Sequence, residues 1–153
     1  MLWACAALGK GLVLFELEVV ECLIPFRQHH SHAAEAGGIL IGYRRGEHLH
    51  VVDATTPGAG DRRSRYEFQR KDPMHQCRAL ALWKRSRQTL DYLGEWHTHP
   101  QAHPTPSCID TSEWAKITRD RRMPMIFAIL GLETWWIGVG RDGRVIRASR
   151  AAD

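Results

Sequence analysis

The sequence predicts one α/β sandwich domain over residues 1–153, in which a mixed β-sheet is flanked by helices. Short β-rich segments alternate with segments of helical periodicity, and no internal repeat or linker divides them. The composition, with 44% hydrophobic and 25% charged residues, is ordinary for a globular protein. A chain of 153 residues is also long enough to bury a sizeable core.

The first third of the chain contains three strand-like segments and one helical segment. Leu12 to Phe15 favours a strand, and residues 16–29 favour a helix that Pro25 should kink or end. Ile39 to Tyr43 is typical of a buried strand. His48 to Thr55 alternates well enough to form a second strand.

The middle of the chain predicts a short strand and then a helix. The strand is expected over 64–70, and Asp72-Pro73 is a good helix start, with the aspartate as N-cap and the proline at the first helical position. Apolar residues then recur at a spacing of three and predict a core face: Met74, Cys77, Leu80 and Trp83.

The last third begins with a strand over 92–98 and continues with a helix that starts after Ser107. The buried face of this helix is expected to contain three apolar residues: Ile109, Trp114 and Ile117. Three β-rich segments follow, over 124–130, 134–139 and 144–147, with a turn at 141–143 before the last.

The most informative motif is H-x-H-P followed after six residues by S-x-x-D. It comprises His97, His99, Pro100, Ser107 and Asp110. In an extended segment alternate side chains point to the same side, so the imidazoles of His97 and His99 should lie on one side of the strand. Two histidines and a carboxylate can hold a metal ion while leaving a fourth position open, which is the arrangement of hydrolytic zinc sites.

Each part of this motif has an ordinary structural explanation. The chain has nine histidines, and a lone H-x-H pair on a strand is more often a surface pair than a metal site. Ser107 and Asp110 alone would indicate a helix N-cap with its capping box. His103 lies in the same loop and is expected to be exposed. The combination at fixed offsets is far more specific than its parts.

These residues carry a family resemblance. The motif resembles the full signature of the JAMM metallopeptidases, also called MPN or JAB, which includes a glutamate before a buried strand; Glu35 precedes such a strand here. The run from Tyr92 to Pro100 is similar to small single-domain bacterial members found in integrative elements and in CBASS anti-phage operons. The resemblance implies the JAMM/MPN sandwich, which is cytidine-deaminase-like, a Zn²⁺ cofactor, and an isopeptidase that frees a cyclic-nucleotide synthase (CD-NTase) from its conjugates.

The resemblance also implies a role for each site residue. His97, His99 and Asp110 would hold the zinc ion, and Glu35 would be the general base that takes a proton from water. Ser107 would donate a hydrogen bond to the tetrahedral oxyanion. From the residues alone, Glu35 could equally be a solvent-exposed residue before a strand, and Ser107 could be purely an N-cap.

The resemblance also implies the partner, a protein substrate with an extended C-terminal tail that lies beside a sheet edge. The formal charge is +4, and basic residues concentrate over 61–87. This basic region either grips the tail or is simply solvated. Aromatic residues are not interleaved with it, so nucleic acid is disfavoured as a partner.

The sequence also predicts a cytoplasmic location. It has no apolar run that could span a membrane and no convincing signal peptide. Its four cysteines are widely spaced, as expected of reduced thiols in the cytosol. Membranes are therefore not expected as partners.

Two other functions stay open. One is a different JAMM peptidase that processes ubiquitin-like or sulfur-carrier proteins with the same ligand set. The other is a non-catalytic MPN scaffold, which loss of a ligand or of the glutamate would indicate; this chain lacks none of them.

Overall fold

A curled, mixed β-sheet carries the site. The computed structural model describes residues 1–151, and within them nine strands join in the order β10-β9-β8-β7-β3-β4-β2-β1-β11. The strands of this sheet are β1 (Leu2–Ala4), β2 (Leu12–Phe15), β3 (Gly37–Arg45), β4 (His48–Ala54), β7 (Asp91–Thr98), β8 (Met125–Leu130), β9 (Trp135–Arg141), β10 (Arg144–Arg147) and β11 (Ser149–Arg150). A separate hairpin pairs β5 (Arg62–Ser64) with β6 (Glu67–Gln69).

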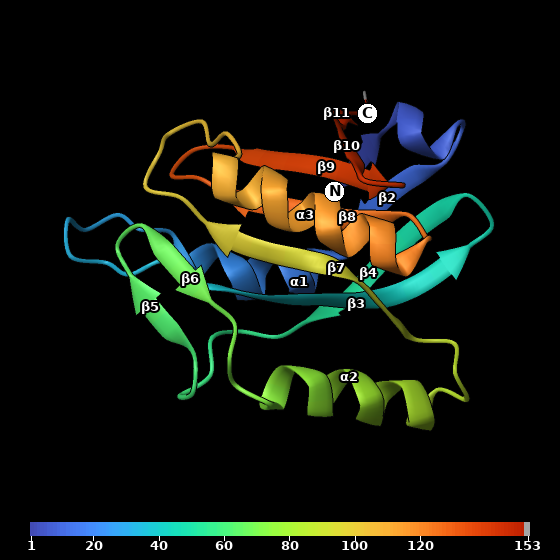
Figure 1. Ribbon diagram of the computed structural model, residues 1–153, viewed down its shortest axis with the longest axis horizontal. Coiled ribbons are helices and arrows are strands. Elements are labelled where there is room, and N and C mark those ends of the chain that lie inside the picture. The colour runs from blue at the N-terminus through green and yellow to red at the C-terminus, as the bar shows by residue number, and fades with distance from the viewer. Residues whose placement is uncertain (152–153) are drawn as a thin grey trace.

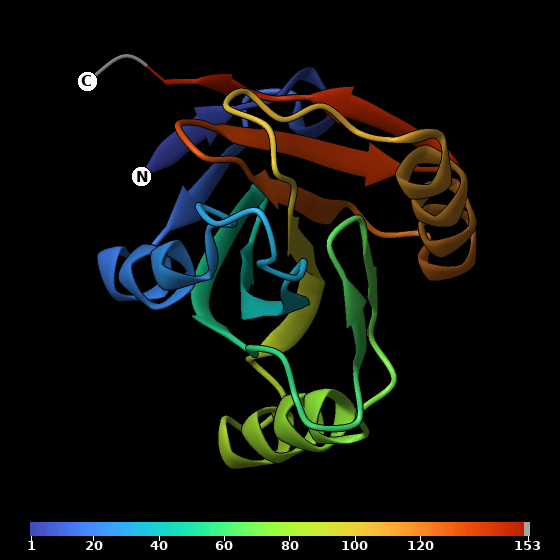
Figure 2. The same cartoon turned by 90° about the vertical axis from the view of Figure 1, so that its left-hand side faces the viewer.

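The two edge strands of the sheet are neighbours in the sequence. Between β10 at one edge and β11 at the other lies only Ala148, which is buried. The sheet therefore curls until its ends approach one another, which the view in Figure 2 shows. Strands β2 and β4 are parallel, as are β7 and β8, whereas the other neighbours are antiparallel.

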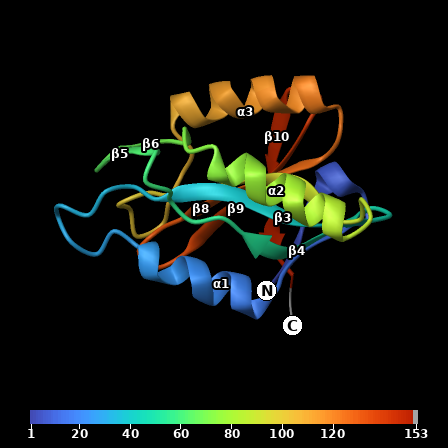
Figure 3. The same ribbon diagram turned by 90° about the horizontal axis from the view of Figure 1, so that it is seen from below.

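Helices cover both faces of the sheet (Figures 1 and 3). On one side lies α1 (Leu17–Leu23), followed by the 3-10 turn η2 (Ile24–Phe26); on the other side lie α2 (Met74–Arg85) and α3 (Cys108–Arg121). A second 3-10 turn, η1 (Ala6–Leu8), connects the first two strands. The α/β sandwich with a mixed sheet and flanking helices is thus confirmed.

Helix α3 is held on the sheet by stacked aromatic rings. The ring of Trp114, only 3% exposed, lies 4.7 Å from the ring of Phe127 and 5.4 Å from that of Trp136. Such stacking adds to the free energy of apolar burial. Because the first residues of α3 belong to the predicted motif, this packing fixes the motif relative to the sheet.

Most predicted strands are present, with three differences. The predicted helix over 16–29 stops at Leu23, because the next turn contains Pro25 and is 3-10. The strand predicted over 64–70 is a hairpin with its turn at Arg65-Tyr66. The short strands β1 and β11 were not predicted, since three and two residues give no clear periodicity.

The predicted core face of α2 is wrong. Met74 is 37% and Leu80 is 48% exposed, and Cys77 is also exposed. The helix instead buries His75, whose Nδ1 lies 2.5 Å from Thr55 Oγ1 and whose Nε2 lies 2.8 Å from Asp61 Oδ2. Polar pairing, rather than an apolar stripe, therefore orients this helix.

In α3 the same kind of error affects Ile109, which is 73% exposed, whereas Trp114 is buried as predicted. Among the described residues, no helix is both long and apolar enough to cross a membrane.

Candidate metal centre

The pairing of β3 with β7 brings Glu35 to the histidines. Gly37 lies opposite His97 in this antiparallel ladder, and the Thr98 N–H donates to the Ala36 carbonyl at 2.8 Å. The same register places Glu35 opposite His99, just beyond the strand ends. Side chains opposite one another share a face of the sheet. Two segments more than sixty residues apart therefore meet at one point.

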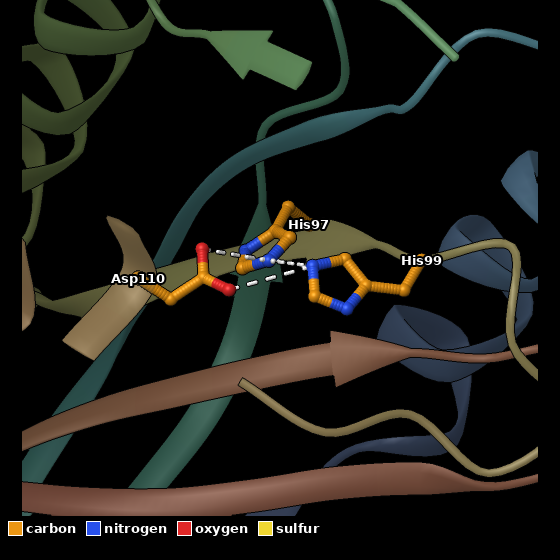
Figure 4. A group of neighbouring side chains, drawn as sticks. All are labelled: His97, His99 and Asp110. Carbon is orange, nitrogen blue, oxygen red and sulfur yellow. Dashed lines mark hydrogen bonds and ion pairs between the residues drawn. The ribbon is translucent and has the colours of Figure 1, made fainter. Parts of the chain in front are cut away.

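His97, His99 and Asp110 converge at this point (Figure 4). The Nε2 atoms of the two histidines are 3.0 Å apart, and the Asp110 carboxylate lies 3.3 Å from His97 Nε2 and 3.4 Å from His99 Nε2. The three donors come from the end of β7 and the first turn of α3, as the motif predicted. Both elements are rigidly packed, so the donors have fixed positions.

The donor set fits a zinc ion. Ligands about 2.0–2.2 Å from a tetrahedral zinc lie about 3.3 Å from one another, close to the three distances found here. Possible ligand atoms of all three side chains lie within 4.8 Å of one another. Two imidazoles facing each other and one carboxylate also match the nitrogen and oxygen ligands that zinc accepts. These residues can hold a metal ion with one position left for another ligand.

A capping box orients the Asp110 carboxylate. The Ser107 N–H donates to Asp110 Oδ2 at 2.6 Å, and the Asp110 N–H donates to Ser107 Oγ at 3.1 Å. The predicted N-cap and capping box are confirmed. One local motif thus begins α3 and directs the carboxylate toward the histidines.

Burial and charge shift the acid–base properties of the site. Glu35 is only 5% exposed, and this burial raises the pKa of its carboxyl to about 7. Burial alone would also raise the pKa of Asp110, but hydrogen bonds from His97 and His99 hold it well below its usual range. Burial would lower the pKa of His99, yet its hydrogen bond to Asp110 raises it. The alternative that Glu35 is an exposed residue before a strand is therefore excluded.

Gly37 and Gly38 allow the start of β3 to pack closely against the neighbouring segments. A Cβ on Gly37 would lie 2.4 Å from the Phe68 ring, and a Cβ on Gly38 would lie 2.1 Å from the Thr55 carbonyl oxygen. Any side chain at either position would displace β3 from its neighbours. The residues immediately after Glu35 therefore fix the path by which it enters the site.

The cluster opens into a cavity of about 740 Å³ between the β5–β6 hairpin and α3. Glu35, the two histidines, Ser107 and Asp110 all line it. Its rim carries Tyr66 from the hairpin turn and Ile109 from α3, which are 74% and 73% exposed. All five predicted site residues thus share one accessible cavity.

The basic residues over 61–87 do not form a surface of unpaired cations. Several of its side chains already have partners: Arg70 pairs with Glu95, Arg78 with Asp53, and Arg63 and Arg65 bind backbone carbonyls. Among the charged side chains that line the cavity, five are carboxylates and Arg70 is the one arginine. Glu95 also lines the cavity, where its carboxylate binds Tyr92 and Arg70.

Sequence reasoning missed the residues that the hairpin contributes. Phe68 covers Gly37, and Arg63 contacts the backbone of Glu35. No local pattern could identify them, because a short hairpin with charged residues is indistinguishable from a solvated loop until its packing is known. His103 lies outside the cluster with a 71% exposed side chain, as predicted.

The fold and the donor set define the class of protein: a metallopeptidase of the JAB type. Residues 24–147 match the Prok-JAB family, the prokaryotic homologs of the JAB domain, and the chain belongs to this family. The solution structure of protein DSY2949 from Desulfitobacterium hafniense superposes with a TM-score of 0.64 over 88% of both chains at 21% identity, which supports the fold.

The chain is also similar in sequence to proteins with assigned names. A protein of Vibrio cholerae named CD-NTase/cGAS isopeptidase is 42% identical over 128 residues, which cover 83% of this chain and 81% of the relative. An Escherichia coli protein of the same name is 42% identical over 126 residues, or 82% and 80% of the two chains. The probable metalloprotease y4qB of Sinorhizobium fredii is 30% identical over 118 residues, or 70% and 72%.

Proposed function

We propose that this protein is a zinc-dependent isopeptidase that hydrolyses the amide bond after the C-terminal tail of a conjugated protein. The observation that carries the proposal is the convergence of His97, His99 and Asp110 with the buried Glu35 in one cavity. Metal-assisted amide hydrolysis requires three ligands around an open position and a nearby carboxyl that can accept and donate a proton.

His97, His99 and Asp110 would hold the zinc ion. When bound, zinc polarises a carbonyl and lowers the pKa of water from about 16 toward about 7. The low pKa of Asp110 keeps its carboxylate charged, and therefore able to bind a cation, across the physiological pH range. The capping box holds this carboxylate in the orientation that binding needs.

Glu35 would act as the general base and then as the general acid. A pKa raised to about 7 in this cavity suits a group that must accept a proton from water and return it to the leaving amine. A bound cation would favour its ionised form before the reaction. The burial of Glu35 and its place opposite His99 in the extended β3–β7 register support this assignment.

Ser107 would stabilise the tetrahedral oxyanion. Its Oγ accepts the Asp110 N–H, which leaves the hydroxyl hydrogen able to point into the cavity. Helix capping and oxyanion binding therefore use different parts of the same hydroxyl. A donor of this kind contributes about 10²–10³-fold to turnover in other hydrolases.

The substrate we propose is a cyclic-nucleotide synthase of bacterial anti-phage defence, joined through its C-terminal residue to another protein. The relatives named CD-NTase/cGAS isopeptidase support this assignment, as does the cavity open to solvent between the hairpin and α3. The tail would lie extended in this cavity, beside the sheet. A cytoplasmic location stays part of the proposal.

The test is cleavage of a fusion between a CD-NTase C-terminal tail and a reporter. Wild-type protein with zinc should release the reporter at the junction, and a chelator should block release. Glu35→Gln should bind zinc but leave the fusion intact, whereas the exposed Glu18→Gln on α1 controls for loss of a carboxylate. An intact fusion after incubation with the zinc-loaded wild type would contradict the assignment.

A second candidate is a metallopeptidase with another protein substrate, which the 30% identity to the probable metalloprotease y4qB supports. Its ligands and base would be the same residues. Release of ubiquitin-like or sulfur-carrier fusions without release of the CD-NTase fusion would favour it. A protein that cleaves none of these fusions would instead fit a non-catalytic scaffold.

A further inference from the structure

The β5–β6 hairpin holds the backbone of Glu35 on both sides. The Glu35 N–H donates to the Ser64 carbonyl at 2.7 Å, and the Glu35 carbonyl accepts from Arg63 Nε at 2.6 Å. A second nitrogen of the same guanidinium, Nη2, donates to the Ala34 carbonyl at 3.3 Å. Both backbone hydrogen-bonding groups of Glu35 are therefore satisfied by one strand, β5.

Sheet pairing does not fix Glu35 by itself. Strand β3 begins at Gly37, and the last ladder-like contact toward β7 is made by Ala36 with Thr98. Glu35 lies beyond this point, in a segment where a chain without further contacts would be free to turn. The contacts with the hairpin are what hold the residue toward the cavity.

The hairpin is itself anchored to the segment before β3. Gln28 is 2% exposed, and its Nε2 donates to the Arg65 carbonyl at 2.8 Å and to the Ala33 carbonyl at 3.0 Å. On the second strand of the hairpin, β6, the ring of Phe68 lies over Gly37. The hairpin is thus a fixed support for residues 33–37, and Arg63 is its contact with the candidate base.

We propose that Arg63 is the positioning residue for Glu35. This inference rests on the proposed role of Glu35 as base. The guanidinium is a planar fork that binds two successive carbonyls, and it therefore fixes the orientation of the peptide between Ala34 and Glu35 as well as its location. The orientation of this peptide determines the direction of the Glu35 side chain. Arg63 does not itself line the cavity that contains the ligands.

This role differs from that expected of a basic region that grips a substrate tail. A gripping arginine contributes to substrate binding, so its loss raises KM and leaves kcat nearly unchanged. A positioning arginine leaves binding intact, so its loss lowers kcat at constant KM. Displacement of a reacting group by about 1 Å can cost about 100-fold in rate.

The experiment compares Arg63→Met and Arg63→Lys with Arg62→Met. Arg62 is the neighbouring exposed residue on β5, and no side-chain hydrogen bond from it is found within residues 1–151. Thermal unfolding first establishes that each variant folds. Zinc content and steady-state cleavage of the tail fusion then give the metal occupancy, kcat and KM.

We expect Arg63→Met to bind zinc as wild type does, with kcat lowered about 10- to 100-fold and KM changed less than about twofold. Arg63→Lys should recover part of the loss, because an ammonium can donate to one of the two carbonyls. Arg62→Met should resemble wild type. An unchanged kcat with a raised KM would overturn the proposal and favour the gripping role.

Hydrogen exchange supplies a readout that does not need activity. In the metal-free protein, the Glu35 amide should exchange at least about tenfold faster in Arg63→Met than in wild type, because its segment opens more readily. Unchanged exchange at this amide would contradict the proposal even if wild type cleaves no fusion. Failure of the proposed function and failure of this inference therefore have separate signatures.

Discussion

The buried carboxyl of Glu35 should make the metal-free protein less stable as the pH rises. Its pKa is raised from 4.5 to about 7 by burial, so the folded protein holds this proton more tightly than the unfolded chain does. The stabilisation from the bound proton is fully present below pH 4.5 and is lost as the pH rises through about 7. Glu35→Gln carries no proton that titrates and should not show this loss.

The magnitude follows from the two pKa values. Each unit of pKa corresponds to about 1.4 kcal/mol, so a rise from 4.5 to about 7 corresponds to about 3 kcal/mol. Burying an amide instead of a carboxylic acid also changes the unfolding free energy, but this change is the same at every pH and cancels when two pH values are compared. The difference in unfolding free energy, Glu35→Gln minus wild type, should therefore increase by about 3 kcal/mol between pH 4.5 and pH 8.

Urea unfolding in the presence of a chelator, followed by tryptophan fluorescence, measures this difference. Titrating groups that do not contact Glu35 contribute equally to both proteins. Saturating zinc should reduce the effect, because a nearby cation favours the ionised carboxyl. A difference that stays constant between pH 4.5 and pH 8 would refute the buried environment from which the base assignment follows.

Three further predictions concern the ligands, the cap and the packing of α3. His97→Ala and His99→Ala should each lose most of the zinc that elemental analysis detects in wild type, since each removes one of three protein ligands. Ser107→Ala should lower kcat by about 10²–10³ while destabilising the fold by about 1 kcal/mol, which kinetics and urea unfolding would separate. Trp114→Ala should cost about 3–5 kcal/mol in unfolding free energy, because it removes the ring stacked on Phe127 and Trp136.

The site was more predictable from the sequence than the elements around it. His97 and His99 could be placed on one face because strand alternation is local, and Asp110 could be placed because the capping box is a four-residue motif. The contribution of Glu35 came from family resemblance, since the pairing of β3 with β7 joins residues far apart in the chain.

The orientation of α2 and the role of the hairpin could not be predicted in the same way. The spacing of Met74, Cys77 and Leu80 indicated a core face, but the buried hydrogen bonds of His75 to Thr55 and Asp61 decide which side faces inward. The contacts of Arg63 with Ala34 and Glu35 depend on where a two-stranded hairpin docks. Neither residue type nor local spacing encodes such long-range polar contacts.

The assignment of the metal centre can be tested directly by locating zinc in crystals of the loaded wild-type protein, through anomalous scattering at the zinc absorption edge. We predict one strong peak about 2.0–2.2 Å from His97 Nε2, His99 Nε2 and an Asp110 carboxylate oxygen, with Glu35 facing it but not ligating it. Zinc bound only at the exposed His103, or at the exposed and stacked pair His30 and His32 before β3, would contradict this assignment.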